Sequence, residues 1–368
     1  MSAYCRMYTF TFPSRPLSKE INMHDYSARS PRRPLVVGAA LLSIGLLASC
    51  SSAASDSGDT GDAGGETQSV ALSLDWSTYV AYHAPFAVAA EQGIWAEHGL
   101  DVTETLPGGS GDAAVEVGTA KTDIAWVDLS TAAASMLQEV PITSVAKVQD
   151  KNASGLTVLE STTLESADDV VGMRIGSTPG GSDSTLIGAF LNANDIGEDE
   201  VTIVNLPANG KFPALMTGEV DAISGQVYFY SSSAEAEGQQ AHGLSFSEMG
   251  LNVLDHGFIA NDTFIEQNPE AISSFLAAYR EALQITIDDP AAACATLVER
   301  SDGEVLQDSC ETQLDLWLPL TTDPAAANWG ENTSDEWQET VEVLTTYGDA
   351  TGTRDPATMF TNDLLPSD

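Results

Sequence analysis

Basic residues are scarce in this sequence of 368 residues, which contains 14 Lys and Arg against 54 Asp and Glu and carries a formal net charge of -40 at pH 7. Residues 1–49 hold six of the basic residues and two of the acidic ones, so the rest of the chain is more acidic still. A surface of this charge repels phosphate groups, which makes nucleic acids and anionic lipid head groups poor partners. Solubility in a salty or variable external medium is the simplest explanation of the charge.

Signatures of the common catalytic machineries are also missing. The sequence has no G-x-S-x-G elbow, no H-E-x-x-H pair and no P-loop. Five histidines are present, and His83 and His256 are too few to build a general base and its relay. We therefore expect a binding protein without a cofactor rather than an enzyme. An adhesin or a signalling ectodomain stays open as a further class.

Cysteine is rare, with four residues in the whole chain. Cys5 and Cys50 lie near the amino terminus, which leaves Cys294 and Cys310 in the globular part. An even pair in an oxidising compartment predicts a disulfide, closing a loop of about 15 residues and contributing about 3 kcal/mol. No nearby histidine completes a ligand set with these cysteines, so we predict no metal site.

The longest apolar run lies near the amino terminus, from Leu35 to Leu47, and is too short for a membrane span, which needs about 20 residues. Three arginines precede it, and the following LASC resembles the bacterial lipobox. We predict a signal peptide over residues 1–49, a lipid on Cys50 and a polar tether over residues 50–69. The protein is then extracytoplasmic and anchored to the cell membrane. A plain secretory signal, the export route (Sec or Tat) and a start at Met23 stay open.

Strand and helix patterns alternate along the rest of the chain. The expected strands of a first set are Val70–Asp75, Leu100–Leu106, Asp123–Val127 and Ile142–Lys147, and of a second set Gly172–Ser177, Val201–Leu206 and Val220–Ser224. Short helices are expected between them, over 85–92, 112–119, 130–138, 184–193 and 210–217. This order predicts right-handed βαβ units and mainly parallel sheets. Ser231–Gly243 looks looser, Leu251–Ile259 is expected to return the chain to the first lobe, and helical spacing begins at Pro269.

Several short segments, taken in order, resemble one family of solute-binding proteins. They are LDW at 74–76, EQGIWAEHGLDV at 91–102, PGGSGD at 107–112, GTAKTDIAWVD at 118–128, VGMRIGS at 171–177 and LMTGEVDAISG at 215–225. The order resembles the NMT1/THI5-like group, which serves ABC importers for thiamin-precursor pyrimidines and has sulfonate, taurine and nitrate binders as relatives. The fungal pyrimidine synthases of the THI5 type share the fold, but their cysteine-rich motif is absent here.

The resemblance implies an α/β fold of two lobes, the type II periplasmic-binding-protein arrangement, with the ligand in a cleft between them. The expected boundaries are 70–158 for the first part of lobe 1, 159–248 for lobe 2, and 249–368 for the return to lobe 1 with the C-terminal helices. We expect a monomer that captures a small heterocyclic molecule and delivers it to an ABC permease. A binder of sulfonate, taurine or nitrate in the same fold is the alternative.

The loops at the carboxyl ends of the expected strands supply the candidate ligand-binding residues. These are Trp76, Tyr79, His83, Gly109, Ser110, Asp128, Ser177, Gly181, Ser182, Tyr228 and Tyr230. Aromatic faces suit a planar heterocycle, and glycines let the backbone approach a ligand. For each residue an ordinary role stays open: core packing for Trp76 and His83, and helix capping for Asp128 and Ser182. Tyr79 and Tyr82 share a turn, so one of them is expected to point inward.

Few cations fall near these loops. Lys211 lies close to an expected cleft loop, whereas Arg174 lies inside a strand and is expected to point outward. A dianion would then depend almost wholly on backbone N–H groups. The sequence therefore favours a neutral or amine-bearing heterocycle over phosphate or nitrate.

Overall fold

Two five-stranded β-sheets organise residues 67–366, the part of the chain that the computed structural model describes. The first sheet has the order β2-β1-β3-β10-β4 and the second the order β7-β6-β8-β5-β9. The strands of the first sheet are β1 (Gln68–Ser73), β2 (Leu100–Thr105), β3 (Ile124–Asp128), β4 (Ile142–Lys147) and β10 (His256–Asn261). Those of the second are β5 (Ser154–Leu159), β6 (Arg174–Ser177), β7 (Thr202–Asn205), β8 (Ala222–Gln226) and β9 (Ala241–Ser245).

The two sheets are mixed, which corrects the prediction of mainly parallel sheets. β1 runs parallel to β2 and β3, and β6 runs parallel to β7 and β8. β10 is antiparallel to both of its neighbours, and so is β5. The reason is connectivity: β5 and β10 each enter their sheet directly from the other sheet instead of through a βαβ crossover.

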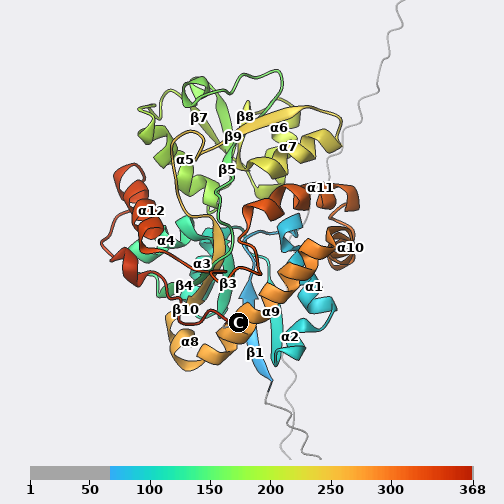
Figure 1. The fold of residues 1–368 in the computed structure, drawn as a ribbon. Helices are drawn as coiled ribbons and strands as arrows, with labels where there is room; N and C mark the ends of the chain where they lie inside the picture. The colour runs from blue at the N-terminus through green and yellow to red at the C-terminus, as the bar shows by residue number, and fades with distance from the viewer. Residues whose placement is uncertain (1–66, 367–368) are drawn as a thin grey trace, which may run out of the picture. The chain divides into compact units, whose positions relative to one another are not determined.

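The sheets form the core of two lobes, each covered by helices (Figure 1). The helices of the first lobe are α1 (Ala84–Glu91), α2 (Ile94–Glu97), α3 (Ser110–Gly118), α4 (Leu129–Leu137), α8 (Asp262–Gln267) and α9 (Pro269–Asp288). Those of the second are α5 (Ser182–Ala193), α6 (Ala208–Met216) and α7 (Val227–Ala236). The later helices are α10 (Pro290–Arg300), α11 (Gln307–Trp317) and α12 (Ser334–Thr346). Short 3-10 turns are η1 (Ala81–His83), η2 (Ala167–Val170), η3 (Leu318–Leu320) and η4 (Pro356–Thr358).

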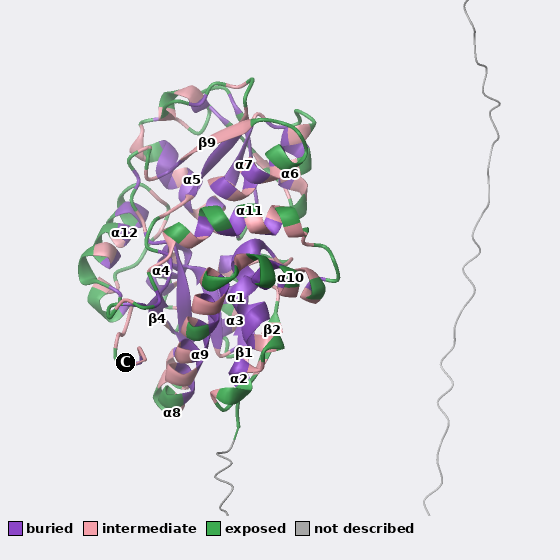
Figure 2. Ribbon diagram, turned by 45° about the vertical axis from the view of Figure 1, so that its right-hand side comes forward, coloured by how far each residue is buried: buried purple, intermediate pink, exposed green. Residues whose placement is uncertain are grey.

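Burial follows the position of each strand in its sheet. Every residue of the central strand β3 is buried, whereas the edge strands β2, β7 and β9 carry exposed or half-buried residues (Figure 2). Pro85 lies in the first turn of α1, as expected for a residue that donates no backbone hydrogen bond. The strand, the turn and the start of α1 thus form as the local sequence predicts.

The segment Ser231–Gly243 is not loose, which corrects another prediction. It contains the second half of α7 and the start of β9. The serines that suggested a loop are accommodated in the helix, because Ser232 Oγ and Ser233 Oγ both donate to the carbonyl of Phe229, at 3.0 and 2.7 Å.

The C-terminal helices cover the first lobe and reach the second. α9 and α10 pack on α1, whereas α11 contacts both η1 and α7, and α12 contacts both α4 and α5. Cys294 of α10 and Cys310 of α11 form a disulfide, with their Cα atoms 5.7 Å apart. The disulfide therefore ties the bridging helix α11 to the first lobe.

Two crossovers connect the lobes: residues 148–153 lead from β4 to β5, and residues 246–255 lead from β9 to β10. They are bonded to one another, since Asp255 accepts a hydrogen bond from the Ala153 amide at 2.9 Å and Asn152 donates to the Leu254 carbonyl at 3.3 Å. The second sheet begins at Ser154, earlier than the expected lobe boundary at residue 159.

The predicted signal peptide over 1–49, the lipidated Cys50 and most of the tether lie outside the described residues. Within residues 67–366, every helix is either too short or too polar to cross a bilayer.

Candidate ligand-binding cleft

The carboxyl ends of β1 and β3 in one lobe face those of β6 and β8 in the other, and a small cavity of about 40 Å³ lies between them. The first lobe lines this inner cavity with Asp75, Trp76, Val80, Tyr82, Ser110 and His256. The second lobe lines it with Ser182, Asp183, Lys211, Gly225, Gln226, Phe229 and Tyr230. Ligands of α/β sheets bind at such strand ends.

The two glycine-rich loops meet across the cleft. The Gly111 amide donates to the Gly180 carbonyl at 3.1 Å, and a Cβ added at Gly109 would lie 2.8 Å from the same oxygen. A Cβ added at Gly181 would lie 3.5 Å from Trp76 Cζ3. Gly109 thus allows the lobes to approach closely, whereas a Cβ at Gly181 would make only an ordinary contact with Trp76, and the structure has the lobes in contact.

Asp75 is the buried carboxylate at the first-lobe side of the cavity. Its Oδ1 is 2.9 Å from His83 Nε2, and its Oδ2 is 2.7 Å from His256 Nε2 and accepts a hydrogen bond from the Tyr82 hydroxyl at 3.0 Å. Burial alone would raise the pKa of Asp75, but His256 and His83 outweigh it and hold the pKa well below its usual range. The carboxylate is therefore kept charged next to the cavity.

The two histidines differ in their hydrogen-bond partners. His83 Nδ1 accepts a hydrogen bond from the Val80 amide at 3.3 Å, so its Nε2 carries the proton that it donates to Asp75. His256 faces Asp75 with one ring nitrogen and Asp255 with the other. Burial opposes its charge, yet Asp75 and Asp255 raise the pKa of His256 well above its ordinary value. His256 is therefore an imidazolium that links the cleft to the second crossover.

Asp183 is the buried carboxylate at the second-lobe side of the cavity, as Asp75 is at the first-lobe side. Its Oδ2 lies 2.7 Å from Lys211 Nζ and accepts hydrogen bonds from Ser224 Oγ at 2.7 Å and the Thr178 amide at 3.2 Å. Lys211 also donates to the Ser224 carbonyl at 2.8 Å. Burial would lower the pKa of Lys211, but Tyr230 and Asp183 raise it, so the ammonium stays charged.

Aromatic rings from both lobes surround this ammonium. Lys211 Nζ is 5.3 Å from the ring centroid of Trp76 and 5.4 Å from that of Tyr230, within the range of cation–π contacts. Trp76 is half-buried, so part of its ring faces open space. Of the two tyrosines on the turn, Tyr82 points to the inner cavity, whereas the Tyr79 hydroxyl donates to Glu104 at 3.1 Å.

The predicted site residues fall into three groups. Trp76, Ser110, Ser182 and Tyr230 line the inner cavity. His83, Asp128 and Ser177 lie behind it: His83 holds Asp75, Ser177 Oγ is 3.4 Å from Asp183, and the Asp128 amide donates to Ser110 Oγ at 3.1 Å. Gly109 and Gly181 contact the opposite lobe, Tyr79 lies in an outer cavity, and Tyr228 lies in a cavity at the crossovers.

Asp128 caps a helix, which is the alternative that the sequence left open for it. Its Oδ1 accepts hydrogen bonds from the Thr131 amide at 2.8 Å and Ser130 Oγ at 2.5 Å, at the start of α4. Burial and the nearby Asp255 raise the pKa of Asp128 to about 6. Helix capping was the open alternative for Ser182, but the N-cap of α5 is Gly181 and no side chain caps this helix.

Among the described residues, one cluster has side chains of the kind that bind metal ions: Asp128, Asp255 and His256. Their potential ligand atoms lie within 4.8 Å of one another. Both ring nitrogens of His256 are already bonded to carboxylates. A metal ion would have to displace Asp75 or Asp255 from His256, so we assign this group to charge pairing rather than to metal binding.

Sequence reasoning missed Asp75, Asp183, Gln226 and His256 as residues of the site. Asp75 stood in the quoted LDW segment, directly after β1, where a cleft residue is expected. Asp183 pairs with Lys211, 28 positions away, and such a pair leaves no local signal in the sequence. Gln226 ends β8, and its Oε1 is buried without a hydrogen-bond partner among the described residues.

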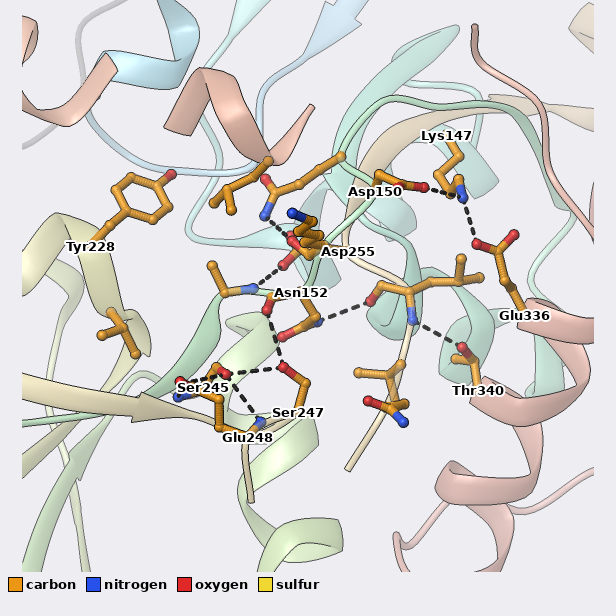
Figure 3. Close-up of a pocket in the computed structure, with 18 of the residues that line it drawn as sticks. Lys147, Asp150, Asn152, Tyr228, Ser245, Ser247, Glu248, Asp255, Glu336 and Thr340 are labelled. Atoms are coloured by element: carbon orange, nitrogen blue, oxygen red, sulfur yellow. Dashed lines mark hydrogen bonds and ion pairs between the residues drawn. The ribbon is translucent and has the colours of Figure 1, made fainter. Parts of the chain in front are cut away.

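A larger cavity of about 820 Å³ lies at the crossovers (Figure 3). Figure 3 shows Lys147 with Asp150 and Glu336 at one end of its lining and Tyr228 at the other. Lys147 Nζ is 2.9 Å from Asp150 and 2.5 Å from Glu336. The lining of this cavity includes Asn152 and Leu254, so the cavity lies against both bonded crossovers.

Comparison with known proteins places the chain in a family. A family described as NMT1/THI5 like matches residues 80–293. A formylaminopyrimidine-binding protein of Halalkalibacterium halodurans is 23% identical over 316 residues, covering 83% of this chain and 91% of that protein. A 4-amino-5-hydroxymethyl-2-methylpyrimidine phosphate synthase of Aspergillus parasiticus is 24% identical over 248 residues, covering 63% of this chain and 71% of that protein.

Solved structures show the same fold. The alkanesulfonate-binding protein SsuA of Xanthomonas axonopodis pv. citri, bound to MOPS, superposes with a TM-score of 0.65 at 14% identity, over 81% of this chain and 99% of that protein. The predicted two-lobed α/β architecture, that of periplasmic binding proteins, is thereby confirmed. Because the family match spans more than half of the 368 residues, the chain belongs to the NMT1/THI5-like family.

Proposed function

We propose that this protein is the substrate-binding component of an ABC importer and that it captures an aminopyrimidine or a similar amine-bearing heterocycle. In this account the lobes close on the ligand and leave it chemically unchanged. The proposal includes the lipid anchor on Cys50, an extracytoplasmic location, a monomeric state and delivery to a membrane permease. Incorporation of labelled palmitate into the wild type but not into the Cys50→Ser variant would test the anchor.

The observation that carries the proposal is the combination of groups around the inner cavity. Trp76 and Tyr230 offer aromatic faces from opposite lobes. Asp75 is a charged acceptor, and the buried Gln226 Oε1 is an acceptor that lacks a partner within residues 67–366. A buried acceptor without a partner is costly, so a ligand N–H group would be stabilising there. A flat ring with an exocyclic amine supplies both the face and the donor.

The charge balance argues against an anionic ligand such as a sulfonate or nitrate. The basic residues lining the inner cavity are Lys211 and His256. Lys211 is bonded to Asp183, and His256 is bonded to both Asp75 and Asp255. An anion entering this cavity would meet cations that are already neutralised and a charged Asp75, which is unfavourable at low dielectric.

The enzyme alternative rests on relatives named as pyrimidine phosphate synthases. Chemistry through an imine would require a neutral lysine amine. Lys211 is the lysine that lines the inner cavity, and its raised pKa and its bonds to Asp183 and Ser224 hold it as an ammonium. The geometry therefore favours binding over covalent chemistry.

The test is a panel of ligands added to the purified protein, read as the shift of its melting temperature. Formylaminopyrimidine and 4-amino-5-hydroxymethyl-2-methylpyrimidine are expected to raise the melting temperature, while taurine, nitrate and an alkanesulfonate are not. The Trp76→Ala variant should lose the response, whereas Tyr347→Ala, which alters a partly exposed ring on the surface, should keep it. Shifts with the anions alone would refute the proposed ligand class.

A further inference from the structure

A further cavity of about 360 Å³, the outer cavity, adjoins the inner cavity on the side of α11 and is distinct from the one at the crossovers. Trp76, Val80, Phe229 and Tyr230 line both cavities, so the two lie side by side at these four residues. The remaining walls of this outer cavity come from α6, α7, the loop before α11 and α11 itself. The outer cavity therefore extends the ligand cleft rather than forming a separate site.

The sizes of the two cavities differ in a way that bears on the ligand. Ligand sites in proteins usually measure roughly 300–1,000 Å³. The inner cavity of about 40 Å³ is far below that range, whereas the outer cavity of about 360 Å³ is within it. The contact between Gly111 and Gly180 holds the lobes together beside the inner cavity. Of these two adjoining cavities, the outer one therefore offers most of the volume for a ligand.

The chemistry of the walls differs as well. The inner cavity carries buried charged groups, among them Asp75 and Lys211, whereas the polar residues of the outer cavity include Asn209, Glu304 and Gln313. The outer cavity presents the rings of Tyr79, Phe212 and Phe229 in addition to Trp76. Phe212 and Phe229 are half-buried and pack at the edge of a cluster of buried hydrophobic residues in the second lobe. A space of this size with several aromatic walls suits a flat ring.

The walls of the outer cavity come from both lobes. Phe212 and Phe229 belong to α6 and α7 of the second lobe. The facing wall includes Cys310, whose disulfide to Cys294 holds α11 against α10, which packs on α1 of the first lobe. Aromatic rings of the second lobe therefore face α11, which the disulfide ties to the first lobe and which also contacts α7.

We infer that the cleft takes a two-part ligand: a hydrogen-bonding heterocyclic head that reaches the inner cavity, and an aromatic substituent that fills the outer cavity. This inference rests on the proposed function, because it takes the head to be an aminopyrimidine. It adds a second subsite and the substrate class that this subsite selects. Phe212 and Ala208, which line the outer cavity alone, are its specificity-determining residues.

The experiment compares two probes by isothermal titration calorimetry: 4-amino-5-hydroxymethyl-2-methylpyrimidine and its benzyl ether at the hydroxymethyl oxygen. The benzyl ether is expected to bind the wild type about 10-fold tighter, because its ring buries apolar surface in the outer cavity. Ala208→Trp, which fills that cavity, and Phe212→Ala, which removes one ring from it, should each abolish the gain. Each substitution should weaken the binding of the benzyl ether by a larger factor than the binding of the unsubstituted pyrimidine.

The control is Ala236→Trp, which adds the same side chain at an exposed position at the end of α7, and the melting temperature of each variant verifies folding. Equal affinity of the wild type for both probes, or an equal loss for both probes in Ala208→Trp, would overturn the two-part ligand while leaving the proposed function standing. If neither probe binds the wild type, the proposed function fails and this inference fails with it.

Discussion

Replacing Asp128 by Asn should stabilise the protein at neutral pH, although the replaced side chain is a buried helix cap. Asp128 is fully buried, its Oδ1 accepts the bonds from Ser130 and Thr131, and its Oδ2 has no partner among the described residues. Asn caps helices about as well as Asp, so its Oδ1 can accept the same bonds. The substitution thus removes a buried charge near Asp255 and keeps the cap.

The magnitude follows from the pKa of Asp128, which burial and Asp255 raise from 3.8 to about 6. Because the folded-state pKa lies above the unfolded one, the stability from this group is fully present below the unfolded pKa and is lost as the pH rises through about 6. A rise of about two in the pKa corresponds to about 3 kcal/mol in the free energy of unfolding. Roughly two thirds of this stability is lost between pH 4.5 and 7.5. The Asn side chain does not titrate, so the variant avoids this loss.

Urea unfolding followed by tryptophan fluorescence at pH 4.5 and 7.5 measures the effect. Relative to the wild type, the free energy of unfolding of Asp128→Asn should increase by about 2 kcal/mol from pH 4.5 to pH 7.5, which means that the variant becomes relatively more stable. Asp289→Asn is the matched control, because Asp289 caps α10 at an exposed position, and its effect should be small at both pH values. An equal destabilisation of Asp128→Asn at both pH values would refute the reasoning.

Three further substitutions or treatments test other parts of the structure. His256→Ala should lower the free energy of unfolding by about 3–5 kcal/mol in urea titrations, because it leaves Asp75 and Asp255 buried without their shared cation. A loss below about 1 kcal/mol would contradict this pairing. Gly109→Ala should weaken ligand binding about 10-fold in calorimetry, since its Cβ would meet the Gly180 carbonyl when the lobes close. The control Gly188→Ala has open space around its Cβ and should bind the ligand as the wild type does. Reduction of the Cys294–Cys310 disulfide should cost about 3 kcal/mol, and an unchanged urea midpoint under reducing agent would count against it.

The fold was largely predictable because each strand and turn carries a local signal. Alternating apolar residues predict β1, and Pro85 correctly predicts the start of α1. The direction of β5 and β10 was not predictable in this way, since it depends on which sheet each strand joins after a crossover. The serine-rich half of α7 also misled the pattern, because its hydroxyl groups bond within the helix.

The site was predictable in its aromatic residues and less so in its charges. Trp76 and Tyr230 follow strands of opposite lobes and meet at the inner cavity, as expected of residues at strand ends. The pairs that set the electrostatics join distant positions: Asp75 with His256 across 181 residues, and Lys211 with Asp183 across 28. Such pairs leave no spacing signal in a single sequence, so they emerge from the packing of the two lobes.

The central claim is that opposite lobes clamp a flat amine-bearing ring through Trp76 and Tyr230. Its most direct test is calorimetric titration of 4-amino-5-hydroxymethyl-2-methylpyrimidine into the wild type and into Trp76→Ala. The account predicts one binding site with a dissociation constant in the micromolar range or below for the wild type, and a loss of at least about 10-fold in Trp76→Ala. Equal affinities of the two proteins, or binding of nitrate or taurine in place of the pyrimidine, would contradict it.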